Sequence, residues 1–391
     1  MTTKTSYIAK SVENLKPSGI RRFFDLAANM EGVISLGVGE PDFITSWTVR
    51  EAAILSLEQG FTSYTANAGL LELREKISGY MKNGYGAEYD PNTEIILTTG
   101  ASQALDISMR AIIDPGDEVV VVEPGFVSYV PLVQLAGGTP VTVETKPENG
   151  FKLTAEELEE AITERTKAVL LCSPNNPTGT VLERENLEEI AEVIRRHDLV
   201  VLSDEIYSEL AYDHGHVSIA SLSGMRDRSI VINGFSKGFA MTGWRLGFIC
   251  APAEIAAPLL KIHQYAMMCA STPAQYAAVE ALDKGMEEVM EMKRSYRHRR
   301  HYFVDSLNEM GLGCHLPGGA FYAFPSVAKT GLSSEEFAEK LLMEEKVAVV
   351  PGNVFGKGGE GHIRCSYASS MEQLQEAVKR MKRFVENHSG N

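Results

Sequence analysis

The sequence predicts an α/β fold, with a large domain built on a mostly parallel sheet between helices and a smaller α+β domain. Short apolar runs alternate with segments of helical period, which is typical of βαβ units. Several runs are continuous stretches of Val, Ile and Leu, as expected for strands that helices cover on both faces. At 391 residues, of which 44% are hydrophobic, the chain is long enough to form two domains.

The predicted elements follow one another along the chain in that alternating order. The candidate strands of the large sheet are residues 94–98, 118–122, 167–172, 199–203, 229–233 and 246–250. Among the helices between them, an acidic and a basic amphipathic one are predicted at 155–164 and 184–197. A long charged helix at about 286–310 is the expected domain junction. The smaller domain is predicted from the apolar runs 320–324, 347–350 and 362–366, and from a closing helix near 371–387.

Charge and cysteine content exclude several classes of protein. A net charge of -15 repels nucleic acid and anionic membranes. The five cysteines are scattered and form no Cys-x-x-Cys pair, which indicates neither a disulfide framework nor a zinc site and favours a reducing cytoplasm. No signal-peptide core and no uninterrupted apolar run of about 18 residues occur, so we expect a protein that is neither secreted nor membrane-spanning.

Residues 233–245 place Lys237 in a turn of glycine and serine, with Arg245 eight residues further on. A lysine amine condenses with an aldehyde to a Schiff base, while Ser236, Arg245 and loop amides can neutralise a phosphate dianion. These are the two demands that pyridoxal phosphate makes of a protein. On this segment alone, a solvated lysine beside a structural arginine is an equally good interpretation.

Two further segments favour the cofactor. An apolar run stops at Asp204, and Tyr207 follows three residues later, as at the carboxyl end of a buried strand, where open α/β sheets bind ligands. An acidic partner such as Asp204 would keep a pyridinium nitrogen protonated and make the ring an electron sink. Residues 173–179, Ser-Pro-Asn-Asn-Pro-Thr-Gly, offer the Asn176 amide to the ring hydroxyl, although ordinary turns have the same composition.

Together with four other segments, these resemble the class I and II aminotransferases of pyridoxal phosphate fold type I. The other segments are residues 37–43, 64–69, 100–104 and 362–367. Their order and spacing are specific, the resemblance covers essentially the whole chain, and it is strongest to a Bacillus-type branch of alanine, aromatic and N-acetyl-diaminopimelate aminotransferases. It implies a seven-stranded sheet in a large domain of residues 41–285 and a small domain of residues 1–40 plus 286–391, so that the N-terminal segment packs with the small domain.

The resemblance implies a phosphate site made by several segments. Residues 100–103 lie where a strand gives way to a helix, so we expect the amides of Ala101, Ser102 and Gln103 to point at a cavity. Taken alone, this segment is equally well a simple capped helix start. Ser236 and Arg245 would add a hydroxyl and a charge.

Two other positions bear on the phosphate. Tyr64 matches a tyrosine that the partner subunit contributes in the family, which implies a homodimer with shared active sites. Gly234 stands where many relatives have serine or threonine. That departure predicts the loss of one hydrogen bond, worth about 1–2 kcal/mol.

Around the ring, Phe126 matches the family's stacking aromatic, although a single phenylalanine is more often a core residue. Asn176 and Tyr207 would donate to the ring's 3-oxygen and lower the pKa of the Schiff base towards neutrality. Lys237, once displaced by the substrate, would move a proton between the substrate α-carbon and C4' of the cofactor.

The substrate carboxylate is assigned to Arg364, whose planar guanidinium matches a carboxylate bidentately, with a structural ion pair as the alternative. Gly39 resembles the family's backbone contact to the same carboxylate, because an amide without a Cβ lets the ligand approach closely. Arg21 or Arg22 would reach a second carboxylate of the substrate, unless this pair is merely solvated.

These residues imply a ping-pong aminotransferase that moves an amino group from an L-amino acid, with alanine preferred, to 2-oxoglutarate. Aromatic, aspartate and N-acetyl-diaminopimelate aminotransferases are alternatives within the family. A C–S β-lyase on the same fold shares every cofactor residue and differs only after the α-proton leaves. A regulator with an aminotransferase-like domain fused to a DNA-binding one is disfavoured by the acidic charge and by a match that starts near the N-terminus.

Overall fold

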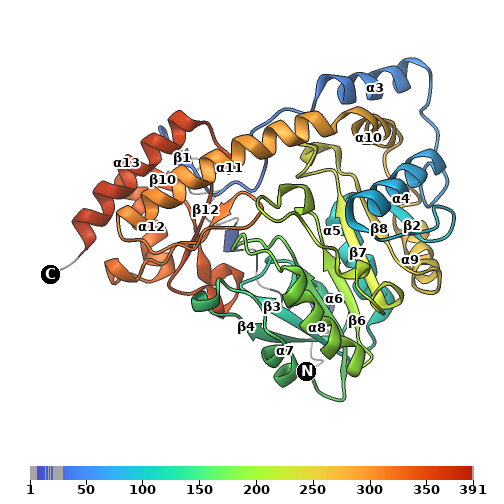
Figure 1. Cartoon of the computed structure of the whole chain (residues 1–391), viewed down its shortest axis with the longest axis horizontal. Helices are drawn as coiled ribbons and strands as arrows, with labels where there is room; N and C mark the ends of the chain where they lie inside the picture. Colours follow the sequence, from blue (N-terminus) through green and yellow to red (C-terminus); the bar gives the residue numbers. More distant parts are fainter. Residues whose placement is uncertain (1–6, 14, 16, 18, 21–29, 390–391) are drawn as a thin grey trace, which may run out of the picture.

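A computed structural model describes residues 7–13, 15, 17, 19–20 and 30–389 (Figure 1). Its centre is a seven-stranded sheet in the order β2-β8-β7-β6-β5-β3-β4, parallel except for β8, which runs antiparallel to β2 and β7. The strands are β2 (Ile95–Thr98), β3 (Glu118–Glu123), β4 (Thr139–Glu144), β5 (Thr166–Cys172), β6 (Val200–Asp204), β7 (Ser229–Gly234) and β8 (Gly247–Cys250). All six candidate strands are confirmed, and each boundary lies within one residue of its predicted place.

The seventh strand, β4, had no counterpart among the candidate runs. It lies at the edge of the sheet and pairs with β3 alone, with Pro140 opposite Val119. Most of its side chains are partly or fully exposed. Proline is tolerated on an edge strand because the missing N–H leaves no ladder bond unmade, but it obscures the strand in the sequence.

Helices cover both faces of this sheet, as predicted. One face carries α5 (Gly100–Ile112), α6 (Tyr129–Leu135) and α9 (Ala253–Ala266). The other carries α4 (Leu71–Tyr85), α7 (Ala155–Ala161), α8 (Arg184–Arg196) and α10 (Thr272–Lys284), while α3 (Trp47–Glu58) packs on α10. Continuously apolar strands provide hydrophobic side chains to both faces of the sheet. In β7, for example, Ile230 and Ile232 pack on the first face and Val231 packs on the second. The predicted helix at 155–164 ends three residues early, at Ala161.

A smaller body follows α11 (Met286–Glu309), which runs from α10 to α13 (Figure 1). It holds an antiparallel sheet in the order β11-β12-β9 and a parallel pair β1-β10. Its strands and helices are β1 (Ile34–Ser35), β9 (Tyr322–Ala323), β10 (Val347–Ala348), β11 (Val350–Pro351), β12 (Ile363–Ser366), α12 (Ser334–Glu345) and α13 (Met371–His388).

Short 3-10 helices occur along the whole described chain. They occupy Pro147–Asn149, Ser208–Leu210, Ile219–Ser221, Arg226–Arg228, Thr242–Trp244, Ala328–Thr330, Gly352–Phe355 and Lys357–Gly359.

The N-terminal segment divides its contacts between the two bodies. β1 pairs with β10 in the smaller body, as the predicted packing requires. The short helix α1 (Lys10–Glu13), however, lies against α6 on the large sheet, so the expectation that this segment avoids the large domain is wrong for α1. The division into residues 41–285 and residues 1–40 plus 286–391 stays a prediction. No helix in the described part of the chain has the length and apolarity to cross a bilayer.

Candidate active site

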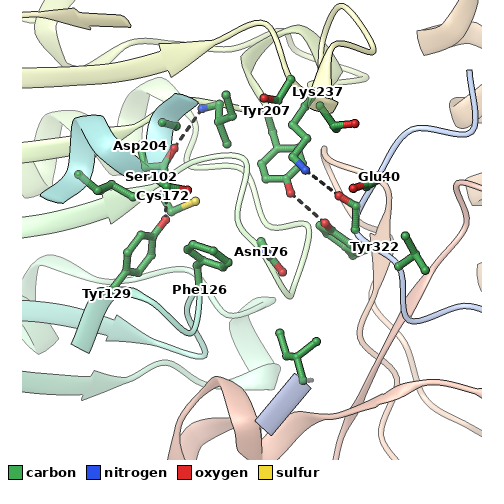
Figure 2. Close-up of a pocket in the computed structure, with 18 of the residues that line it drawn as sticks. Glu40, Ser102, Phe126, Tyr129, Cys172, Asn176, Asp204, Tyr207, Lys237 and Tyr322 are labelled. Carbon is green, nitrogen blue, oxygen red and sulfur yellow. Dashed lines mark hydrogen bonds between the residues drawn. The ribbon is translucent and has the colours of Figure 1, made fainter. Parts of the chain in front are cut away.

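A cavity of about 750 Å³ lies at the carboxyl ends of the central strands, between the seven-stranded sheet and the smaller body (Figure 2). Most of the predicted site residues line it: Gly39, Ala101, Ser102, Phe126, Asn176, Asp204, Tyr207, Ser236, Lys237, Arg245 and Arg364. They come from segments spread over more than three hundred positions of the chain. The alternation of strand and helix brings their ends to one edge, as the rule for open α/β sheets requires.

Lys237 lies in the turn that follows β7, with its side chain directed across the cavity. Its Nζ donates to the carbonyl oxygen of Gly39 at 2.6 Å and lies 5.9 Å from the centroid of the Tyr207 ring. Burial lowers the pKa of this amine to about 8, with Glu40 opposing the shift and the Arg364 guanidinium adding to it. A lysine with such a pKa is partly neutral near pH 8 and can act as nucleophile or base.

Asp204 is the last residue of β6, and its carboxylate is buried at the back of the cavity. The Tyr129 hydroxyl donates to Oδ2 at 2.7 Å, and the Ile206 amide donates to Oδ1 at 3.2 Å. Burial raises the pKa of Asp204 to about 6, against the effect of these two hydrogen bonds. No cationic side chain in the described part of the chain pairs with it at salt-bridge distance, so a buried anion faces the cavity with room for a cationic partner.

The cavity lining also contains a group of hydrogen-bond donors. Ala101 and Ser102 lie in the first turn of α5, where backbone N–H groups have no partner within the helix. Ser236 and Arg245 face this turn from the loop after β7. Arg245 has a left-handed backbone, with φ of 52°, and its Nη1 donates to the carbonyl oxygen of Thr242 at 3.1 Å. A cation, hydroxyls and free amides together form a donor set that fits a phosphate.

The side chain of Gln103 does not line the cavity, while the predicted contact through its backbone amide stays a prediction. Its Oε1 accepts from the Thr99 amide at 2.6 Å, and its Nε2 lies 3.0 Å from Nδ1 of the buried His263. This side chain therefore closes the start of α5 towards α9 and away from the ligand space. The side chains of a first turn face different directions, whereas its backbone N–H groups all point along the helix axis.

Gly234 is closely packed between two strands. It lies inside β7 opposite Gly247 of β8, and it is absent from the cavity lining. A Cβ at this position would lie 2.8 Å from Gly247 Cα and 2.9 Å from the carbonyl oxygen of Leu246. A serine or threonine here would force the backbone of β8 to shift, and the predicted loss of a phosphate hydrogen bond stays a prediction.

Three predicted residues are not part of this described lining. Tyr64, in the segment between α3 and α4, is 78% exposed and does not line the cavity of its own chain. This position leaves its predicted role across a dimer untested. Arg21 and Arg22 lie outside the described residues.

Phe126 and Asn176 occupy the middle of the cavity. The Phe126 ring packs edge-on against Tyr129, with centroids 5.6 Å apart and planes at 80°. Asn176 accepts a hydrogen bond on Oδ1 from Arg364 Nη1 at 2.9 Å. Its Nδ2 is thereby left as the group that can donate to a ligand, which agrees with the predicted contact to a ring oxygen.

Arg364, in β12, is a buried cation with only neutral partners. Besides Asn176, it donates through Nη2 to the Gly37 carbonyl oxygen at 2.6 Å, while Nε has no partner. Its guanidinium lies 4.4 Å from the centroid of the Tyr322 ring and 5.0 Å from that of Phe355. No carboxylate among the described residues forms a salt bridge with it, which disfavours the structural ion pair and favours an anionic ligand.

The cavity residues that sequence reasoning missed include three with polar side chains that contact the site: Tyr129, Tyr322 and Glu40. Tyr129 carried a usable signal, since it follows Phe126 by three residues and so shares its face of the chain. Tyr322 carried none, because β9 has two residues and its neighbours in space come from distant segments. Glu40 adjoins the predicted Gly39, but nothing in the sequence distinguishes it from other exposed carboxylates.

Comparison with known proteins identifies the family of this chain. The family described as "Aminotransferase class I and II" matches residues 31–381. The chain belongs to the class I and II aminotransferases. The predicted family is therefore confirmed, and so is its enzymatic class.

Individual aminotransferases match over nearly the full length. The chain is 65% identical over 381 residues to the putative aminotransferase YugH of Bacillus subtilis (strain 168), covering 97% of this chain and 99% of that protein. It is 50% identical over 374 residues to an aspartate aminotransferase of Pyrococcus abyssi (strain GE5 / Orsay), covering 95% and 96%. The crystal structure of an aromatic aminotransferase from Pyrococcus horikoshii OT3 matches with a TM-score of 0.90 at 48% identity, covering 94% and 99%. This structural match confirms the predicted fold class.

Proposed function

We propose that this aminotransferase holds pyridoxal phosphate in the cavity and moves an amino group from an L-amino acid to 2-oxoglutarate by a ping-pong mechanism. The observation that supports the proposal best is one cavity with three groups that have no ionic partner in the described chain: the buried carboxylate of Asp204, the desolvated amine of Lys237 and the buried guanidinium of Arg364. They match a ring nitrogen, an aldehyde and a carboxylate, respectively.

Pyridoxal phosphate supplies an aldehyde that takes up the amino group and a ring that withdraws electrons from the substrate α-carbon. Asp204 would hold the proton on the ring nitrogen, and Tyr129 fixes the orientation of its carboxylate. Ala101, Ser102, Ser236 and Arg245 would hold the phosphate, with Tyr64 of a second copy adding a hydroxyl.

Three residues would position the ring and its oxygen. Phe126 would pack on the face of the ring, and its own orientation is set by the edge contact with Tyr129. Asn176, through Nδ2, and Tyr207, through its hydroxyl, would donate to the 3-oxygen. Both side chains are almost fully buried, so these hydrogen bonds would form away from water, where they are stronger.

Lys237 and Arg364 would handle the substrate. Arg364 would bind the α-carboxylate and so fix the α-carbon near the Lys237 amine. Gly39 lies close to this site, and a Cβ there would lie 2.7 Å from the Tyr322 hydroxyl, so only glycine fits without moving that side chain. Lys237 Nζ would then take the proton from the α-carbon and return it at C4' of the cofactor. Its lowered pKa keeps a fraction of this amine neutral at physiological pH.

We propose alanine as the preferred donor. At the mouth of the cavity lie Ile20 and Val38, which suit a small apolar side chain, and Glu40, whose carboxylate disfavours an acidic donor. Aspartate and aromatic amino acids are alternatives suggested by the names of two relatives, and N-acetyl-diaminopimelate is a further one. The second carboxylate of 2-oxoglutarate would need a cation beyond the described lining, the role predicted for Arg21 or Arg22.

A homodimer is part of the proposal. Several large apolar side chains in and beside α3, and at and after the end of α9, are exposed: Ile44, Trp47, Leu57, Tyr64, Tyr265, Met267 and Met268. Asn67 Nδ2 donates to the Met268 carbonyl oxygen at 2.8 Å, so the two segments form one surface. An apolar surface of this kind marks a protein interface, and covering it with a second copy would bring Tyr64 to the neighbouring cavity. A cytoplasmic location is consistent with five unpaired cysteines.

Half-reactions on the purified protein test the function. Single amino acids are added, and the absorbance of the lysine-bound cofactor is followed as it converts to that of pyridoxamine phosphate. We expect alanine to drive the conversion and 2-oxoglutarate to reverse it, with Lys237→Ala inactive. Lys293→Ala is the matched control, because Lys293 is also partly buried but lies outside this cavity.

The same experiment separates the alternatives. Faster conversion by aspartate or an aromatic amino acid would replace alanine as the donor and keep the reaction. Release of ammonia and pyruvate from a substrate with a β-leaving group, without any oxo-acid acceptor, would indicate the C–S lyase. A cofactor band that no amino acid converts would contradict amino transfer by this cavity.

A further inference from the structure

The Tyr322 hydroxyl occupies the point where three parts of the site meet. The side chain is buried in β9, and its hydroxyl oxygen lies 2.8 Å from that of Tyr207. Its ring lies under the guanidinium of Arg364, with 4.4 Å from Cζ to the ring centroid. On the third side, Gly39 approaches so closely that a Cβ there would lie 2.7 Å from the same hydroxyl.

This hydrogen bond joins two separate sheets across the cavity. Tyr207 follows β6 of the seven-stranded sheet, and Tyr322 belongs to the three-stranded sheet, where it pairs with Ser366 of the strand that carries Arg364 (Figure 2). Tyr207 is on the side predicted to contact the cofactor, and Tyr322 is on the side predicted to contact the substrate carboxylate. The hydroxyl pair therefore connects the two binding surfaces directly.

The direction of the hydrogen bond follows from the number of protons available. A phenolic hydroxyl has one hydrogen to donate and can accept with its lone pairs. If Tyr207 donates its hydrogen to the ring oxygen, it can only accept from Tyr322, and the Tyr322 hydroxyl has no other hydrogen-bond partner among the described residues. A hydroxyl that accepts a hydrogen bond becomes a stronger donor itself, because the two bonds polarise each other.

We infer that Tyr322 is a positioning residue that acts through Tyr207, strengthening its hydrogen bond to the cofactor oxygen and linking that bond to carboxylate binding at Arg364. The inference rests on the proposed function, since it needs the cofactor oxygen beside Tyr207. The charged groups that face the hydroxyl pair are Arg364 from β12, Lys237 from the loop after β7 and Glu40 from the N-terminal segment. All three remain in place when only the Tyr322 hydroxyl is removed.

The experiment is a spectroscopic titration of the holoenzyme with Tyr322→Phe. The pKa of the lysine–cofactor linkage is read from its absorbance as a function of pH, with and without a saturating non-reactive carboxylate such as maleate. We expect the variant to raise this pKa by about half a unit to one unit, because a weaker Tyr207 donor stabilises the oxygen anion less. We also expect the change that maleate causes in the wild type to become smaller.

Three further variants make the result specific. Tyr207→Phe should shift the pKa in the same direction and by more, and the double variant should equal Tyr207→Phe alone, because Tyr322 acts through that residue. Tyr322→Leu removes the ring as well and should in addition raise the KM for the amino acid, since Arg364 loses its support. Tyr367→Phe is the matched control, because this buried hydroxyl bonds to Tyr212 and the Ala320 carbonyl outside the cavity.

An unchanged pKa and an unchanged maleate effect in Tyr322→Phe, together with a shift in Tyr207→Phe, would overturn the inference. Failure of the proposed function looks different, because the wild type itself would then show no lysine-bound cofactor band or no shift in Tyr207→Phe. Thermal melting of each variant checks the fold. If Tyr322→Phe is destabilised, titration at a temperature well below its midpoint of unfolding still decides the question.

Discussion

The two walls of the cavity are built in different ways. The wall proposed for the cofactor consists of strand ends and adjoining turns of one sheet, with Asp204 ending β6 and Lys237 following β7. The wall proposed for the carboxylate combines β12, β9 and the N-terminal segment around Gly39. The first wall is fixed by a single hydrogen-bonded ladder, whereas the second is assembled from separate pieces.

The difference shows in the hydrogen bonds. Asp204 is held within its own body, by Tyr129 and Ile206. Arg364, in contrast, bonds to Asn176 across the cavity and to Gly37 in the N-terminal segment, and Lys237 reaches Gly39 in that segment. A preformed wall suits a cofactor that stays bound, while a wall cross-linked between bodies suits substrates that enter and leave in each half-reaction.

Asp204→Asn is the strongest test of the first wall. The amide cannot hold a proton on the ring nitrogen as an anion does, so we expect kcat/KM to fall by about 10³-fold or more for every donor alike. Stopped-flow half-reactions with alanine and with an aromatic amino acid measure it. Asp198→Asn, an exposed position just before β6, serves as control, and a loss that depended on the donor would contradict this division of roles.

Arg364→Lys tests the second wall and has the next largest expected effect. A lysine cannot bind a carboxylate bidentately, so we expect a fall of about 10²-fold in kcat/KM for alanine. Ethylamine, which lacks the carboxylate, should react equally slowly with both proteins. Cofactor absorbance should stay normal, and its loss would show that Arg364 belongs to the cofactor wall after all.

The smallest expected effect is the pH dependence of cofactor capture by the cofactor-free protein. Only the neutral amine of Lys237 attacks an aldehyde, and its pKa is lowered to about 8. The neutral fraction therefore rises as pH increases through 8, and the rate of capture should increase about fivefold between pH 7 and pH 8. An increase that continues unchanged to pH 10 would indicate an ordinary lysine instead.

The first wall was predictable from the sequence because each residue sits at the end of an apolar run. Asp204 and Lys237 needed only the strand pattern and the rule that ligands bind at carboxyl ends. The second wall was predictable in part, through Arg364 and the permissive Gly39. Tyr322 was not, since its role depends on contacts between strands that no local pattern encodes.

What the sequence did not predict has local physical causes as well. On α5, the side chain of Gln103 turns towards His263, so that only its backbone amide is available for the predicted contact. β4 contains a proline that only an edge strand tolerates, so strand patterning alone did not reveal it. Gly234 was interpreted through the chemistry of the phosphate alone, because its close packing against β8 depends on strand pairing that the sequence does not show.

That packing has a consequence for how this sequence can change. Gly234 and Gly247 face each other across β7 and β8, and a Cβ on Gly247 would lie 2.7 Å from the amide nitrogen of Ala101. A Cβ on Gly100 would in turn lie 2.7 Å from Nη2 of Arg245. The three glycines are therefore linked through their contacts: a side chain at Gly234 or Gly247 would force neighbouring backbone to shift, and one at Gly100 would displace the Arg245 guanidinium.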